Sequence, residues 1–292
     1  LAWTEDPQGD ERFALWLKRL PDGKPQRLLD DIGPSLCWAE DQTAHGATLL
    51  FTRFDATQRP DSIWRLPLNW SAQADSATAD TPVRVFVEPD AEFWVGIGKT
   101  RSKAWLMIES ASKDTSEIHV LPAQSPDAPL ACLHPRTPGV EASIEHRPGA
   151  FYRLHNHAGP HFQLDVLSEA HALAGGVDSR NAWQTLIAHR QDVTLEGVDA
   201  FAWGLIIAER DHRDAQVYLS RLVLDDACEA PPHITLDERL ALPETPCSQL
   251  LEDAPHFATT TLRLREESFT QPPRWVELDL PSGQRRVVKT QP

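Results

Sequence analysis

Two stretches near the ends of the chain share one pattern: WLKRLPDGKPQRLLDD at residues 16–31 and WVELDLPSGQRRVVKT at residues 275–290. Each reads as an apolar strand, a Leu-Pro-Asp/Ser-Gly turn and a second strand. Proline presets the backbone of such a turn, and glycine takes the position that needs a positive φ. The pattern therefore predicts a β-hairpin at each end of the chain.

The chain between these hairpins divides into units of four short apolar runs, of which the first complete one reads LCWAED, TLLFTRFD, SIWRLPLN and VRVFVEP. Units starting at Leu36, Phe93, Ser143, Leu195 and Gln249 are separated by 57, 50, 52 and 54 residues. A period of about 50 residues built from four strands is typical of a β-propeller blade. We expect an all-β propeller with about five whole four-stranded blades and one partial blade at residues 1–34. A large β-sandwich, or two of them, is the alternative.

Little else interrupts the strand pattern. Helical periodicity is confined to a short turn at residues 167–174, LSEAHALA, and the 24 prolines leave little room for long helices. Residues 71–81, SAQADSATADT, predict a solvated loop or disordered insertion, and residues 175–181 and 225–232 look like similar excursions. No linker divides the chain, so residues 1–292 are expected to form one propeller domain, incomplete at its N-terminus.

Composition excludes several classes of function. The formal net charge of −15 argues against binding to nucleic acid and favours cationic partners. The four cysteines are far apart, which predicts reduced thiols rather than a zinc site or a disulfide framework. No apolar run is long enough to span a membrane, and no motif calls for a cofactor.

The segment ESASKDTSE at residues 109–117 contains Ser110 and Lys113 at the Ser-x-x-Lys spacing of some serine enzymes. In those enzymes the serine begins a helix, whereas apolar strand-like runs flank this segment on both sides. We therefore interpret it as the turn of a hairpin. A Gly-x-Ser-x-Gly nucleophile motif is absent from the sequence, and no catalytic residue is expected in this chain.

Three histidines, His155, His157 and His161, form the most ligand-like cluster. The first two would share one face of a strand, and the third would return across a turn. No further ligand accompanies them, so an exposed hairpin is the preferred interpretation and metal binding the alternative.

Acidic residues recur on or beside the first run of each unit, where they would ring one mouth of a central tunnel. Such a ring would attract cationic peptides in a salt-dependent way. The alternative is that strand ends in an acidic protein are simply acidic. The candidate residues are Glu40, Asp41, Asp90, Glu92, Glu145, Glu196, Asp199, Glu252 and Asp253.

Several segments together resemble the propeller of oligopeptidase B-type peptidases, in the prolyl oligopeptidase family. The similarity covers essentially the whole chain. One similar segment is GKTRSKAWLMIESASKDTSEIHVL, which begins at Gly98, and its part from KTRS to TSE, residues 99–117, is the most specific. Other similar segments, in chain order, are LAWTED, LCWAED, FTRFD with the Arg59-Pro60 pair, FYRLHNHAGPHFQL, WQTLIAHRQDVTLEG and TTLRLREESFTQPPRWVELDLPSGQRRVVK.

The resemblance implies a seven-bladed propeller that caps an α/β-hydrolase domain in a cytoplasmic serine peptidase, which cleaves short peptides after Arg or Lys. The first blade would be missing here and the second truncated. The Ser-Asp-His triad would lie beyond this chain, which alone is expected to be inactive. Its partners would be the covalently linked catalytic domain and short basic peptides.

Two other functions remain open from the sequence. One is a free-standing propeller that binds a protein or peptide partner. The other is a propeller enzyme that acts through tunnel carboxylates or the His155 cluster.

Overall fold

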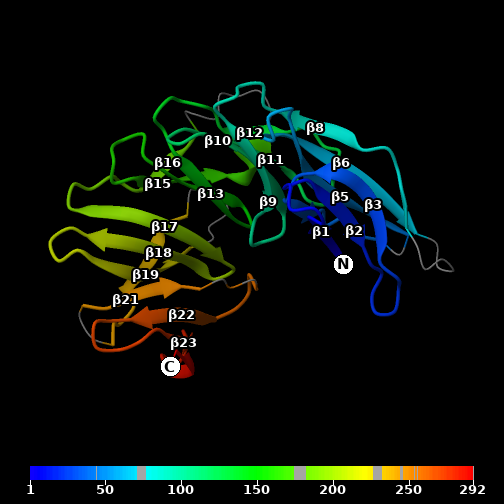
Figure 1. Ribbon diagram of the computed structural model, residues 1–292. Helices are drawn as coiled ribbons and strands as arrows, with labels where there is room; N and C mark the ends of the chain where they lie inside the picture. Colours follow the sequence, from blue (N-terminus) through cyan, green and yellow to red (C-terminus); the bar gives the residue numbers. More distant parts are fainter. Residues whose placement is uncertain are drawn as a thin grey trace. The chain divides into compact units, whose positions relative to one another are not determined.

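The computed structural model describes residues 1–43, 45–70, 77–173, 182–225, 232–243, 246–252, 254 and 256–291, and nearly all of its regular structure is β-strand (Figure 1). These residues form two compact units, Leu1–Val140 and Glu141–Pro292. The sheets of each unit are antiparallel, and their strands follow one another in chain order with one exception in unit 1. Among the described residues, no helix is long and apolar enough to cross a membrane.

The described residues of unit 1 form three sheets. The first consists of β1 (Ala2–Glu5), β2 (Phe13–Leu17) and β3 (Gln26–Ile32). The second consists of β4 (Leu36–Trp38), β5 (Gly46–Phe54), β6 (Pro60–Trp70), β7 (Ala77–Ala79) and β8 (Val83–Val87), the last two both pairing with β6. The third consists of β9 (Trp94–Lys99), β10 (Trp105–Ala111), β11 (Ser116–Pro122) and β12 (Ala131–His134).

Unit 2 contains three four-stranded sheets among its described residues. The first consists of β13 (Ala142–Arg147), β14 (Ala150–His155), β15 (Gln163–Ser168) and β16 (Gln184–Ile187), with the short helix α1 (Glu169–Leu173) after β15. The second consists of β17 (Val193–Phe201), β18 (Gly204–Asp211), β19 (Gln216–Leu224) and β20 (Ile234–Arg239). The third consists of β21 (Ser248–Leu251), β22 (Thr261–Glu267), β23 (Arg274–Asp279) and β24 (Arg285–Thr290).

These sheets confirm the predicted all-β fold, and four of the six sheets formed by the described residues have the predicted four strands. Each predicted run coincides with a strand, the opening residues supply the expected three strands, and α1 lies inside the predicted helical turn. The prediction for residues 71–81 is wrong in part, because Ala77–Ala79 forms β7. The side chain of Gln26 accepts a hydrogen bond from the Ala77 amide at 3.0 Å and donates one to its carbonyl at 2.8 Å. The predicted excursion at residues 175–181 lies outside the described residues, as does the one at 225–232 apart from its two end residues.

The two turns that share the Leu-Pro-Asp/Ser-Gly pattern use their glycines differently. Both glycine amides donate to the carbonyl four residues earlier at 2.8 Å, Gly23 to Arg19 and Gly283 to Asp279. Gly283 has φ +68°, as predicted, whereas Gly23 is not among the residues with positive φ. At Gly23 a Cβ would lie only 2.6 Å from the Arg19 carbonyl oxygen, so close approach rather than conformation requires glycine there.

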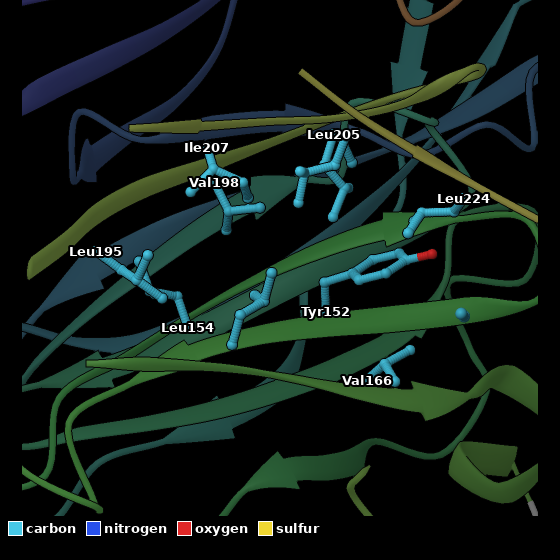
Figure 2. Packing of buried hydrophobic residues seen from close by; sticks show 12 residues of the cluster. Tyr152, Leu154, Val166, Leu195, Val198, Leu205, Ile207 and Leu224 are labelled. Carbon is cyan, nitrogen blue, oxygen red and sulfur yellow. The ribbon is translucent and has the colours of Figure 1, made fainter. Parts of the chain in front are cut away.

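Apolar side chains fill the space between successive sheets of each unit. In unit 2, Tyr152, Leu154 and Val166 of the first sheet pack against a set from the second sheet, as Figure 2 shows. That set includes Leu195, Val198, Leu205, Ile207 and Leu224. Since a buried Leu or Ile gains about 1.5–3 kcal/mol relative to exposure, this interface contributes a large share of the stability of unit 2.

A pair of leucines on one sheet tests this packing. Leu205 is fully buried, whereas Leu236 on β20 is 38% exposed. Leu205→Ala should lower the free energy of unfolding by about 3 kcal/mol because it leaves a cavity, and Leu236→Ala by less than about 1 kcal/mol. Chemical denaturation followed by tryptophan fluorescence measures both. Equal losses for the two variants would contradict the assignment of Leu205 to the core.

Candidate functional site

A buried carboxylate, Glu88 of unit 1, forms hydrogen bonds with residues from other parts of the chain. It follows β8 directly, and it is only 2% exposed. Its carboxylate accepts a hydrogen bond of 2.6 Å from the Ser110 hydroxyl on β10 and a short one from the Arg136 guanidinium. Burial opposes ionisation of Glu88, but the bonds from Arg136, Ser110 and the Asp90 amide outweigh it and hold its pKa below the ordinary value.

Arg59 fixes the loop that runs from Glu88 to Phe93. Its guanidinium donates to three main-chain carbonyls: those of Glu88 at 3.1 Å, Asp90 at 2.8 Å and Phe93 at 2.6 Å. Asp55 orients the guanidinium through a 2.9 Å ion pair. We call Arg59, Glu88, Ser110 and Arg136 the Glu88 network.

The second arginine of the network, Arg136, also contacts this loop. Its guanidinium carbon lies 3.6 Å from the centroid of the Phe93 ring, while one of its nitrogens bonds Glu88. The network therefore presents Asp90 and Glu92 on a loop of fixed shape.

The Ser-x-x-Lys segment is a hairpin, as predicted. Ser110 lies on β10, opposite Glu117 of β11, and its side chain is fully buried. Lys113 lies in the exposed turn, which the Ser112 amide closes by donating to the Thr115 carbonyl at 2.9 Å. Because the Ser110 hydroxyl donates to an ionised carboxylate and has no access to solvent, it is placed to stabilise the loop rather than to attack a substrate.

The acidic candidates of unit 1 lie beside β4 and β9, at the places the sequence predicted. Glu40 forms an ion pair with Lys99, and Asp41 accepts a hydrogen bond from the Thr48 amide at 3.0 Å. Asp90 accepts one from the Glu92 amide at 3.0 Å and lies 3.9 Å from Arg136. Glu92 is exposed at the loop surface. The positive charge of Lys99 offsets the negative charge of Glu40. Glu92 therefore contributes more to the negative electrostatic potential than Glu40 does.

The acidic candidates of unit 2 lie on or just after first strands as well. Glu145 is on β13, Glu196 and Asp199 are on β17, and Glu252 follows β21. Glu196 forms an ion pair with Arg210, which offsets its charge. Asp253 lies outside the described residues. A ring made by the acidic residues of both units stays a prediction.

Of the three histidines, His155 and His157 are neighbours, since the His157 amide donates to Nδ1 of His155 at 3.3 Å, whereas His161 has separate surroundings. The imidazole of His155 is buried and bonds Asp165 at 2.7 Å, whereas His157 is exposed. Burial opposes ionisation of Asp165, but His155 and Arg153 outweigh it and lower its pKa to about 2. His161 bonds the Thr194 hydroxyl at 2.8 Å instead.

Thr194 also bonds His212 at 2.8 Å, so His161 joins histidines from later in the chain. Its ring lies 4.7 Å from that of His212 and 5.6 Å from that of His189. In the part of the chain that the structure describes, no group of three or more histidine, cysteine or acidic residues has the geometry to hold a metal ion.

The sequence did not assign a role to Glu88, Arg136 or Arg59. Glu88 and Arg136 are 48 residues apart, and neither belongs to a recognisable motif. The two residues of a buried ion pair between distant loops have no fixed spacing in the sequence, so a sequence pattern cannot reveal them.

The Glu88 network gives a prediction for stability. Glu88→Gln should lower the free energy of unfolding by about 3 kcal/mol at neutral pH, because Arg136 loses its buried counter-charge. Glu92→Gln, a matched change on the exposed part of the same loop, should cost less than about 0.5 kcal/mol. Urea titrations of the two variants measure the difference.

The pH dependence follows from the lowered pKa of Glu88. Its contribution is fully present above the ordinary value of 4.5 and is lost as the pH falls through the lower folded-state value. The gap between wild type and Glu88→Gln should therefore shrink in acid. A gap that stays constant down to the acid transition would contradict an ionised Glu88.

The sequence of this chain is similar to those of several peptidases. Dipeptidyl aminopeptidase BI of Pseudoxanthomonas mexicana is 28% identical to this chain, covering 100% of the chain and 37% of that protein. Protease 2 of Moraxella lacunata is 25% identical, covering 100% of the chain and 38% of that protein. The chain thus spans less than two fifths of the length of these relatives.

Solved structures agree on the fold. Oligopeptidase B from Trypanosoma brucei, with covalently bound antipain in a closed form, superposes with a TM-score of 0.79 at 23% identity, covering 100% of this chain and 38% of that one. Oligopeptidase B from Leishmania major gives 0.78 at 19% identity, covering 100% and 39%. The sequence matches the family described as prolyl oligopeptidase, N-terminal beta-propeller domain, over residues 1–291. The chain therefore belongs to this family and has its all-β propeller fold.

Proposed function

We propose that this chain is the non-catalytic, substrate-gating propeller of a cytoplasmic, oligopeptidase B-like serine peptidase that cleaves short peptides after Arg or Lys. The observation that carries the proposal is the family match over residues 1–291, combined with relatives whose own chains are more than twice as long. The remaining length of such a protein would hold the catalytic α/β-hydrolase domain. The described residues would contribute a scaffold of packed sheets.

The proposed role of the propeller is exclusion by size. A flexible peptide can pass a narrow opening that a folded protein cannot, and movement of the propeller against a linked domain would gate entry. Exclusion by size needs rigid walls, and the packed apolar side chains between the sheets would make each unit rigid. Selection of substrates would then depend on length and flexibility as well as on sequence.

Negative charge would assist the capture of basic peptides. The chain carries a net charge of −15, and Glu92 and Glu252 are candidates whose charge no ion pair described above offsets. A carboxylate near an opening raises the local concentration of cations, and salt screens this effect. The two residues would act on capture rather than on the chemical step.

A first experiment tests the activity and the gate together. The full-length protein should hydrolyse an arginyl amide and an unstructured arginine-containing peptide, and it should leave a folded protein with exposed arginines intact. The isolated chain should hydrolyse none of them. Hydrolysis by the isolated chain that Ser110→Ala abolishes would overturn the proposal, as would efficient cleavage of the folded protein by the full-length protein.

A second experiment tests the charges. In the full-length protein, Glu92→Gln with Glu252→Gln should lower kcat/KM for a basic peptide about threefold at low salt, and the effect should vanish at about 1 M salt. The control, Asp237→Asn with Glu238→Gln, changes net charge equally on the exposed strand β20 and should leave kcat/KM unchanged. Equal losses in both double variants would remove any special role for Glu92 and Glu252.

A further inference from the structure

Phe269 is the most exposed large hydrophobic side chain in the described part of the chain, at 96%. It lies in the loop of residues 268–273 between β22 and β23. The loop is ordered by its own hydrogen bonds: the Ser268 hydroxyl accepts from the amides of Thr270 at 3.2 Å and Gln271 at 3.1 Å, and the Ser268 amide donates to the Gln271 carbonyl at 3.1 Å. These hydrogen bonds therefore hold the loop in a conformation that leaves the Phe269 ring exposed.

A groove of about 760 Å³ lies beside this ring, between the second and third sheets of unit 2. We call it the Phe269 groove. Phe269 and Leu250 give it apolar walls, and Leu250 is 46% exposed on β21. Gln216 joins the two sheets in this region, because its side chain accepts from the Cys247 amide at 3.1 Å and donates to the Cys247 carbonyl. Exposed apolar surface with this support is typical of a contact site.

Gln291 lies close to the groove, because its hydrogen-bond partner Pro273 lines it. The Gln291 amide donates to the Pro273 carbonyl at 2.8 Å, which ties the end of β24 to the loop that carries Phe269. In Figure 1 the C mark lies next to β23, the strand that starts at this loop. A segment that follows Gln291 would start beside the groove, at a high effective concentration.

We propose that the Phe269 groove is the docking site for the part of the full-length protein that follows Gln291, with Phe269 as its anchor. The proposal rests on the linked catalytic domain proposed above. Relatives match this chain with less than two fifths of their own length, so ample chain is available to cover the groove. Once docked, the Phe269 ring would be buried and would hold the two parts of the protein together while other contacts open and close.

Thiol labelling of the full-length protein tests whether the groove is covered. Thr270→Cys places a thiol next to Phe269, and Thr235→Cys places one on β20 as a control; both threonines are exposed in this structure. A maleimide should label position 270 about tenfold more slowly than position 235, as expected if docking buries the neighbouring ring. Adding Phe269→Ala should restore fast labelling at position 270. Equal labelling of the two single variants would overturn the proposal.

Crosslinking identifies the occupant. Phe269 is replaced by p-benzoylphenylalanine in the full-length protein, Leu236 is replaced in a control, and the products are mapped by mass spectrometry. Crosslinks from position 269 to residues after Gln291 of the same molecule support the proposal. Crosslinks to a second copy, or a yield no higher than from position 236, overturn it.

Peptidase activity keeps the two proposals apart. Labelling and crosslinking report on docking whether or not the protein cleaves arginyl substrates. A docked but inactive protein would therefore count against the proposed function alone. An active protein with an open groove would count against the docking site alone.

Discussion

The burial of apolar side chains on both faces of a sheet is the constraint on which the structure depends. In unit 2, Leu205 and Ile207 of β18 pack toward the first sheet, while Ile206 between them packs with Leu262 and Leu264 of the third. Unit 1 repeats this arrangement on β5, where Leu49 and Phe51 belong to one core and Leu50 to the next. A sheet covered on both faces needs consecutive apolar residues rather than alternating ones, which is why the strands read as short unbroken apolar runs.

That property made the fold predictable from the sequence. Runs such as GLIIAERD are easily recognised, and proline and glycine mark where they end, so strand positions and the four-strand period could be derived from residues close together in the chain. Local patterns failed where distant residues decide the outcome. The strand β7 depends on Gln26, which lies 51 residues before Ala77, and the need for glycine at position 23 comes from the Arg19 carbonyl rather than from φ.

The polar site was predictable only in part. Acidic residues could be placed on or beside first strands, because strand assignment was sufficient for that. The partners that decide their charge, Lys99 for Glu40 and Arg210 for Glu196, come from elsewhere in the chain and could not be read from spacing. The same holds for His161, which sequence proximity grouped with His155 but which tertiary structure joins to Thr194 and His212.

The way in which Arg59 holds its loop has a consequence for divergence. All three carbonyls that it binds belong to the main chain, so its hold on the loop does not depend on the side chains at positions 91 and 92. Mutations there can alter what the loop displays without altering how it is folded. The exposed side chains of the loop could therefore change during evolution while its backbone stays the same. Relatives that share only about a quarter of their residues could keep one fold and still differ in what they bind.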